Sequence, residues 1–583
     1  MQAAIDTLGH KLDLQARRNV DQDDDDVEPQ RGETDTQPKT PLLEYYRCRK
    51  KNPKPQANPE MSVPEQSDSE LDSAVDDILP NRLTLLKILE YTEQFWPTCP
   101  LTAINSPEPT RPRGIPPHVS EEDYVGFPES LESALSFIDL SLRSVDFGVV
   151  SRCMVWLCLC YQQLPGDFTD VETDTPFNSQ ESIDRYLLRV ETWYQVRSVP
   201  VCNLSFVEAL ALRSELFLAM GCPSKAWQST RAALDSAMLL GLYRPSRSHR
   251  ERDAWETLWI QDRRISLFLG LPYSVPEHLT SDPLGEKHIS LEKKALRKLA
   301  IVSGHISDRD LLGSDAPYSD TERIIEEMNE LRAMIPVKWG TKRDLATSSF
   351  AQAFTHGMIK FFYYTTKQMV HLPFAQHSEE DERTKHNKIA GFDAAEGAVL
   401  VYQAIRALEI TPYIPTRNEF LDFVGFSSAL ILSSDLVSVI PGTSSLKEQQ
   451  ERWEKVMELT KTMRRLSDEL DFTVAGHAAD VLEHFQAGSN GSFNSCEAYE
   501  VTIPYFGEMK VSRNVPNKKL HAGLRKPSEM DKFYIELETN AFTFRRANEC
   551  LNDKEMLEAW DADYGFDFTW DWKNKYEFWG SDM

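Results

Sequence analysis

The chain has 583 residues, 41% apolar and 27% charged, and its 64 Lys and Arg against 91 Asp and Glu give a net charge of −27. At about 150 residues per domain, this length allows roughly four domains, although one large helical domain with tails fits equally well. The acidic balance argues against a protein whose whole surface binds nucleic acid or anionic membrane by charge, but leaves room for a small basic module.

Nine cysteines without a C-x-x-C pair are too few for a disulfide scaffold. The N-terminus lacks the apolar core of a signal peptide, and the most apolar run, residues 149–161, is too short to cross a bilayer. We therefore expect a soluble intracellular protein with reduced thiols and no membrane contact.

The first 78 residues are predicted to contain no folded domain. Residues 1–18 carry apolar residues four, three and four positions apart, which indicates either a short coiled-coil-like segment or a frayed amphipathic helix. Residues 19–78 form an acidic, proline-bearing linker with too few large apolar residues to order itself. Within it, a basic cluster at 47–54 is a candidate nuclear-import signal or a solvated stretch. Its residues are Arg47, Arg49, Lys50, Lys51 and Lys54.

Helical periodicity dominates from residue 79, and we predict an all-α fold for residues 79–515. A first clear helix, 206–220, is apolar around its circumference and should be buried. The next is expected to begin with Ser224 as its N-cap and to end at Gly241. A third carries one apolar stripe and ends at the Gly-Leu-Pro sequence that starts at Gly270.

Later segments show the same helical pattern, and one segment does not. The expected helices are 322–334, 351–371, 391–409, 421–440, 447–470 and 475–487. Strand-like alternation is convincing only in 501–513.

The C-terminal segment, residues 516–583, ends in an unusual tail at 551–583. There, nine aromatic residues alternate with nine acidic and three basic residues. Aromatic side chains kept in solution by neighbouring carboxylates are typical of an acidic activation segment, and the alternative is a tail docked on the helical domain. The candidate contact residues are Trp570, Trp572, Phe578 and Trp579.

Sequence motifs of enzymes are missing from the chain. It contains no phosphate-binding G-x-x-x-x-G-K-[ST] loop, no H-E-x-x-H and no G-x-S-x-G elbow. Cys158 and Cys160 lie two positions apart on an apolar helix and cannot ligate one ion, so buried thiols are the better interpretation. His477 and His484 could share a helix face but lack a third ligand. We therefore predict no catalytic and no metal-binding residues.

One acidic residue interrupts the apolar stripe of the third helix. Asp262 stands seven positions after Trp255 and seven before Leu269. An unpaired buried charge is costly, so we expect a buried, paired carboxylate. Three arginines are candidate partners: Arg185, Arg189 and Arg244. A ligand contact is the alternative.

These segments resemble the middle homology region of fungal-specific transcription factors. The resemblance lies in DRYLLRVETW, AMGCPSKAWQSTRAALDSAMLLGLYRP and LWIQDRRISLFLGLPYSV, followed in order by IIEEMNELRAMIPVKW, FFYYTTKQMVHLPF, VGFSSALIL and IPYFGEMKV. It covers roughly residues 80–515. The matching positions are Ala226, Trp227, Arg231, Ala232, Ala237, Gly241 and Leu242, then Trp259, Asp262, Arg263, Ser266, Gly270 and Pro272, and later His371 and Pro373.

The resemblance implies a nuclear regulator of RNA polymerase II transcription with three parts. In that family a cysteine-rich binuclear zinc cluster binds DNA, a short coiled coil dimerises the protein and the helical region controls activity, often with an acidic C-terminal segment that contacts the transcription machinery. Only Cys48 stands in the first 78 residues of this chain. We therefore expect no zinc or other cofactor here unless a zinc cluster is encoded upstream of Met1. DNA contact is expected through such a module, in a homodimer, or through a DNA-bound partner.

Two other classes of protein remain as alternatives. GCPSKAWQSTRAALDSAMLLG resembles one tetratricopeptide unit, which would suit a helical-repeat interaction scaffold, but no second copy follows 34 residues later. An all-α enzyme with a scattered site is the third interpretation, and the missing motifs disfavour it.

Overall fold

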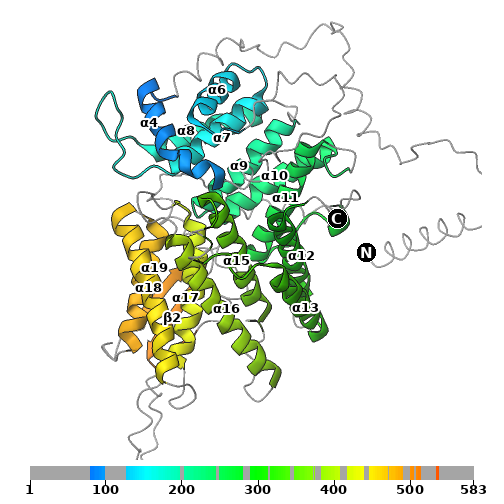
Figure 1. Cartoon of the computed structure of the whole chain (residues 1–583), viewed down its shortest axis with the longest axis vertical. Helices are drawn as coiled ribbons and strands as arrows, with labels where there is room; N and C mark the ends of the chain where they lie inside the picture. Colours follow the sequence, from blue (N-terminus) through cyan, green and yellow to red (C-terminus); the bar gives the residue numbers. More distant parts are fainter. Residues whose placement is uncertain are drawn as a thin grey trace, which may run out of the picture. The chain divides into compact units, whose positions relative to one another are not determined.

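The computed structural model confirms an all-α fold, with a small sheet added near residue 500 (Figure 1). The predicted segment 1–18, the basic cluster 47–54 and the tail 551–583 lie outside the residues that it describes. Those residues are 79–98, 127–196, 203–244, 248–279, 289–312, 316–341, 344, 347–371, 373, 382–407, 416–438, 446–470, 472–489, 499–503, 507–513 and 533–536.

The first helices pack around one apolar core, which we call the N-terminal core. They are α4 (Arg82–Thr92), the 3-10 helix η1 (Glu93–Thr98), α6 (Leu131–Leu142), α7 (Phe147–Gln162) and α8 (Ser179–Val196). Polar caps set where three of them begin, because Asn81, Ser130 and Asp146 each accept a hydrogen bond from a backbone N–H of the first turn.

Three helices in the middle of the chain lie side by side (Figure 1), namely α9 (Leu204–Ala219), α10 (Pro223–Leu240) and α11 (His249–Leu269). The prediction that Ser224 caps α10 is wrong. The N-cap is Cys222, and Pro223 occupies the first helical position, where its missing N–H costs no hydrogen bond. The predicted ends are confirmed, since Gly241 and Gly270 close α10 and α11 with left-handed φ angles of 69° and 63°.

Helix α11 belongs to two cores at once. Its first half gives Leu258 and Trp259 to the N-terminal core, and its last turns give Ile265 and Phe268 to a second apolar core, which we call the C-terminal core. The junction between the two cores therefore falls near Asp262, in the middle of one continuous helix.

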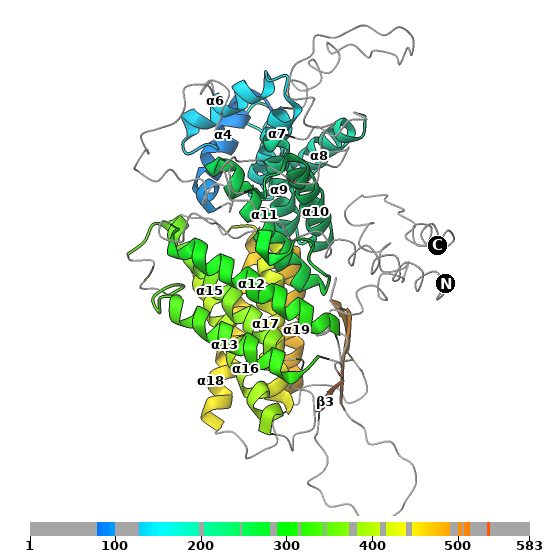
Figure 2. The ribbon, with the colours of Figure 1, turned by 90° about the vertical axis from the view of Figure 1, so that its right-hand side faces the viewer.

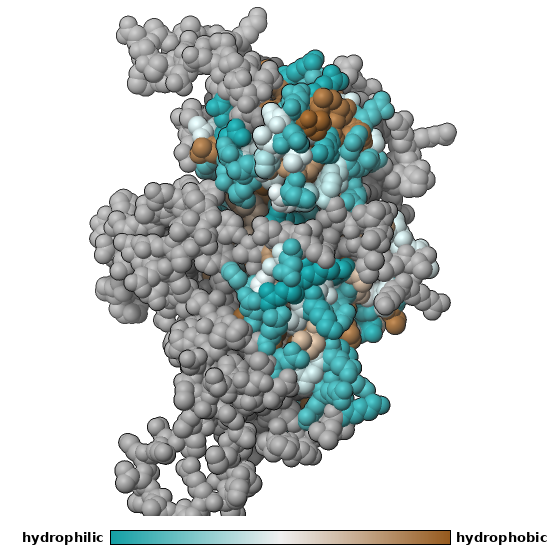
Figure 3. All heavy atoms as spheres, turned by 90° about the vertical axis from the view of Figure 1, so that its left-hand side faces the viewer, coloured by the Kyte–Doolittle hydropathy of each residue, from teal (hydrophilic) through white to brown (hydrophobic). Residues whose placement is uncertain are grey.

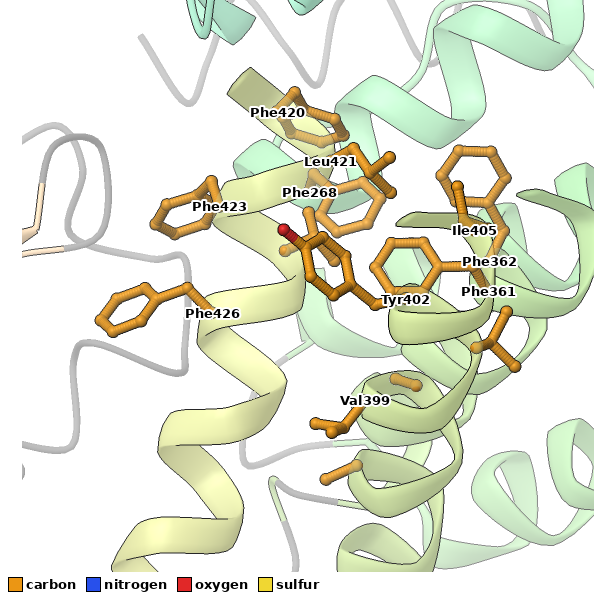
Figure 4. Close-up of a cluster of buried hydrophobic side chains, with 14 of the residues drawn as sticks. Phe268, Phe361, Phe362, Val399, Tyr402, Ile405, Phe420, Leu421, Phe423 and Phe426 are labelled. Carbon is orange, nitrogen blue, oxygen red and sulfur yellow. The ribbon is translucent and has the colours of Figure 1, made fainter. Parts of the chain in front are cut away.

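The C-terminal core is formed by seven further helices (Figure 2). They are α12 (Leu291–Leu312), α13 (Tyr318–Met334), α15 (Phe350–His371), α16 (Glu382–Ala407), α17 (Glu419–Ser438), α18 (Leu446–Leu470) and α19 (Thr473–Ser489). Figure 4 shows aromatic side chains from α11, α15, α16 and α17 meeting in this core. There the rings of Phe268 and Phe420 lie edge to face with centroids 5.0 Å apart.

The predicted strand segment 501–513 forms two strands of an antiparallel sheet. They are β1 (Tyr499–Ile503) and β2 (Gly507–Arg513), and a third strand, β3 (Phe533–Glu536), pairs with β2. The register sets Val501 opposite Met509 and Val511 opposite Ile535. Strand β3 lies against α17.

The described surface is mainly hydrophilic on the face drawn in Figure 3, with one gathering of hydrophobic residues near the top of that view. Among the described helices none combines the length and apolar character needed to span a membrane.

Candidate functional site

Several residues of α10 and α11 that carry the sequence resemblance come together around the fully buried carboxylate of Asp262. Nε of Arg231, on α10, lies 3.1 Å from Oδ1 of Asp262, close enough for an ion pair but without the alignment of a hydrogen bond. The other oxygen, Oδ2, accepts hydrogen bonds from the backbone N–H of Ser274 at 2.8 Å and from its hydroxyl at 3.1 Å. The expectation that Asp262 is buried and paired is confirmed.

The partner of Asp262 differs from the three arginines that the sequence suggested. Arg185 lies 3.8 Å from Glu181 on the surface of α8, Arg189 stacks on Trp193, and Arg244 lies over Tyr243. Arg231 is the ion-pair partner of Asp262 instead, because α10 packs directly along α11. The distance between Arg231 and Asp262 in the sequence gave no indication that they are in contact, although Arg231 was already one of the positions that carry the resemblance.

A tryptophan and a serine complete the contact between α10 and α11. Nε1 of Trp227 and Nη2 of Arg231 each donate to the hydroxyl of Ser266 at 3.2 Å. The Arg231 guanidinium also lies 4.8 Å from the centre of the Trp227 ring. The two hydrogen bonds to Ser266 thus join α10 to α11, while the cation–π contact holds Arg231 against Trp227 within α10.

The same side chains hold the segment that follows α11. Residues 270–279, which we call the strap, end in a short 3-10 helix (Glu277–Leu279). Arg231 donates to the carbonyl of Pro272, Asp262 accepts from Ser274, and Arg263 donates to the carbonyl of Val275 at 3.2 Å. Further along, Nε1 of Trp255 donates to the carbonyl of Leu279 at 3.2 Å. Ser274 and its neighbours were not singled out from sequence, because a loop serine carries no periodic signal.

Arg263 is almost fully buried between two aromatic rings. Its guanidinium carbon lies 4.5 Å from the ring centre of Trp259 and 4.0 Å from that of Tyr273. A methyl group on Gly304 of α12 would come within 1.9 Å of Nη1, so glycine is needed there to admit the guanidinium. Tyr273 in turn donates to Asp308 of α12 at 2.9 Å.

Burial shifts the pKa values of the ionisable groups in this cluster toward their neutral forms. Loss of hydration raises the pKa of Asp262, and Arg231 and Ser274 partly offset it. Burial likewise lowers the pKa of Arg231 and of Arg263 from the ordinary arginine value, against the opposing effect of nearby acidic groups and tyrosine. A buried ion pair of this kind gives orientation rather than much net stability.

The remaining motif positions have packing roles in the structure. Ala226, near the start of α10, is fully buried in the C-terminal core. His371, at the end of α15, is buried and donates through Nδ1 to the side-chain oxygen of Asn387 at 2.8 Å. Loss of hydration lowers the pKa of His371 to about 4, so the ring is neutral at pH 7. Pro373 lies just beyond this helix end.

Other buried charges form groups that the sequence analysis missed. On α9, Glu208 accepts from Arg152 of α7 at 2.8 Å and from Arg250 of α11. On α17, Asp422 accepts from Arg406 and from the hydroxyl of Tyr402, both on α16. Each acid interrupts an apolar run as Asp262 does, so the same signal would have found them.

His356 is a third such group. Its ring lies between Asp344 and Glu292, 3.0 Å from each carboxylate, and stacks on Trp339. The hydrogen bond from His356 lowers the pKa of Glu292 to about 2.

The predicted buried thiols are confirmed, and no metal site is formed by the described residues. Cys153, Cys158 and Cys160 are buried on α7, and burial raises the pKa of Cys153 to about 12. His477 is exposed on α19. Within the described ranges, no three His, Cys, Asp or Glu side chains gather as metal ligands would.

The chain is similar in sequence to fungal proteins named as regulators. It is 23% identical over 426 residues to a dehydrocurvularin biosynthesis regulator of Aspergillus terreus, which covers 64% of this chain and 57% of that protein. It is 20% identical over 390 residues to a protein of the same name from Alternaria cinerariae, covering 58% and 50%.

A third similar protein is the transcription factor eupR of a Phoma species, 27% identical over 192 residues, or 29% of this chain and 41% of that protein. The chain thus spans about half the length of the curated relatives it matches. No family model matches it.

Proposed function

We propose that this protein is a nuclear, non-enzymatic regulator of RNA polymerase II transcription of the fungal zinc-cluster type. The observation that carries the proposal is its similarity to three fungal proteins named as biosynthesis regulators or as a transcription factor.

In this proposal the helical domain, residues 79–515, controls an activation segment in the tail at 551–583. The test is to fuse the full chain, and separately the tail, to an unrelated DNA-binding domain and to measure a reporter gene. We expect the tail to activate the reporter and the full chain to activate it less. A silent tail would contradict the activation segment and favour a tail docked on the domain.

The aromatic residues of the tail should supply the contact with the transcription machinery, while the acidic residues keep them in solution. Replacement of four aromatic residues with alanine is therefore expected to abolish activation. These residues are Trp570, Trp572, Phe578 and Trp579. As a control, replacement of the basic residues Lys554, Lys573 and Lys575 with alanine leaves the aromatic residues in place and should preserve activation.

Contact with DNA is proposed to come from a DNA-bound partner, from a homodimer, or from a zinc cluster outside these 583 residues. The 583 residues contain no C-x-x-C pair, and their net charge of −27 opposes binding to phosphate. We expect metal analysis of the purified chain to find no bound zinc and binding assays to find at most weak, salt-sensitive DNA affinity. Two zinc ions per chain would contradict this part of the proposal.

Nuclear localisation is proposed to depend on the basic cluster at 47–54. Replacement of Arg49, Lys50 and Lys51 with alanine should move a fluorescent fusion of the chain from the nucleus to the cytoplasm. Replacement of three basic residues of α18, Lys447, Arg452 and Lys461, gives a control with the same loss of charge. Unchanged nuclear accumulation of the first variant would refute the role of the cluster.

A further inference from the structure

The strap folds back along α11 and touches both cores. Its hydrogen-bond partners on α11 run from Asp262 and Arg263 back to Trp255 as the strap proceeds from Ser274 to Leu279. Its first residues pack against the C-terminal core through Leu271, and Val275 is buried in the N-terminal core. The strap therefore bridges the same junction that α11 crosses.

Little apolar surface holds the strap in place. Of its ten residues, only Val275 is buried, while Pro272, Ser274, Pro276, Glu277 and His278 are exposed. Segments with few buried apolar side chains open at a lower free energy than the helices on which they rest. The strap is attached mainly by the polar side chains of Arg231, Asp262, Arg263 and Trp255.

Several polar atoms of these side chains lack a hydrogen-bond partner while the strap is docked. Oδ1 of Asp262, Nε of Arg231 and both Nε and Nη1 of Arg263 are buried without a hydrogen-bond partner among the described residues. Burial also shifts the pKa of each of these groups toward its neutral form. When the strap lifts, water can reach Asp262 and Arg263, and this hydration offsets the hydrogen bonds that are lost.

We propose that the strap is a conformational switch that opens locally, without unfolding of α11. While it is docked across the junction of the two cores, it holds the protein in its less active state. The regulatory part of this proposal rests on the proposed function, because the strap would be the element through which the helical domain controls activity. The opening itself does not depend on that function.

Hydrogen exchange of the full chain, resolved by peptide, tests the opening. The backbone N–H of Ser274 donates to Asp262, so its exchange reports the undocked strap directly. We expect the amide of Ser274, which the docked strap protects, to exchange faster than those of residues 256–266 of α11 under native conditions. Equal rates at Ser274 and in this part of α11 would mean that the strap is released only by unfolding of the domain, and would overturn the proposal.

A serine variant shifts the equilibrium without risk to the fold. Ser274→Ala removes the hydroxyl that donates to Asp262 at 3.1 Å, and Ser274 is exposed. Loss of a hydrogen bond to a charged group should speed exchange of the strap about tenfold or more, with α11 unchanged. The matched control is Ser348→Ala, which removes a hydroxyl that donates at 3.0 Å to the buried Asp344 outside the strap. It should leave the exchange of 272–279 unchanged.

The reporter assay with the tethered full chain tests the regulatory part. Ser274→Ala should raise reporter output several-fold above wild type, and Ser348→Ala should not. Faster exchange with unchanged output would overturn the regulatory role. A reporter silent with every variant refutes the proposed function, and the exchange measurement then still decides whether the strap opens by itself.

Discussion

At the level of single residues, three buried carboxylates in the described part of the chain are each paired with an arginine. Asp262, Glu208 and Asp422 lie on different helices, and each meets an arginine from a neighbouring helix. Since hydration lost on burial is only partly regained in such pairs, breaking one partner away costs much more than the pair itself contributes.

Replacement of Asp262 is therefore expected to destabilise the protein strongly. Asp262→Ala strands the Arg231 guanidinium and should lower the free energy of unfolding by about 3–5 kcal/mol. Urea denaturation followed by circular dichroism measures the loss. The control is Asp139→Ala, which removes the exposed pair of Asp139 with Arg143 and should cost no more than about 1 kcal/mol. Similar small losses in both variants would refute the buried pair.

His371 makes the stability depend on pH. Its pKa falls from 6.5 to about 4 on folding, so the unfolded chain takes up the proton first as the pH drops. The stability that neutral His371 contributes is complete above pH 6.5 and is lost as the pH falls toward 4, at about 1.4 kcal/mol per pH unit and about 3 kcal/mol in all.

The non-titrating variant His371→Gln should lack this part of the pH dependence. The urea midpoints of wild type and variant are measured between pH 8 and pH 4.5. Above pH 6.5 the difference between them should stay constant, and below pH 6.5 it should shrink as the wild type loses stability. Parallel curves over the whole range would contradict a neutral, buried His371.

At the scale of helices, close contact depends on small residues at the points where helices meet. Gly425 of α17 faces Tyr402 of α16, and a methyl group there would lie 2.7 Å from the tyrosine ring. Tyr402 has no room to yield, because it is fully buried and its hydroxyl donates to Asp422 at 2.7 Å.

Gly425→Ala is accordingly expected to lower the free energy of unfolding by about 1–3 kcal/mol, although alanine favours helix by about 1 kcal/mol. Thermal denaturation measures the change. Gly166→Ala is the control, since no atom outside its own chain neighbours lies within 4 Å of a methyl group there. A stabilised Gly425→Ala variant would mean that the two helices separate more easily than their packing indicates.

At the scale of the whole molecule, the two cores share one helix. Since α11 supplies Trp259 to the N-terminal core and Phe268 to the C-terminal core, neither core can unfold and leave this helix intact for the other. The described part of the chain should therefore lose both cores together.

We expect one cooperative transition in denaturant. Tryptophan fluorescence, to which five tryptophans of the N-terminal core contribute, and circular dichroism at 222 nm should give the same midpoint. Phe268→Ala, a change in the C-terminal core, should then lower the fluorescence midpoint as well, by a loss of about 3–5 kcal/mol. Two separate transitions would show that the cores unfold independently.

Much of the fold followed from local signals in the sequence. The helical period, the glycines that end α10 and α11 and the alternation in 501–513 predicted those elements correctly. Helices α4, α6, α8 and α12 and the first turns of α16 were not predicted as separate elements. In α12 and α16, charged residues interrupt the apolar stripe. Strand β3 was missed because four residues are too short for a period to be recognised.

The position of Asp262 on an apolar stripe is a local property of one helix, and it was therefore enough to predict a buried, paired carboxylate. The identity of Arg231 as the partner, and the part that Ser274 and the strap play in the site, emerged from the packing of the folded chain. Both depend on which helices pack side by side and on where a loop returns, and residues 12 to 31 positions away in the chain carry no local mark of that proximity.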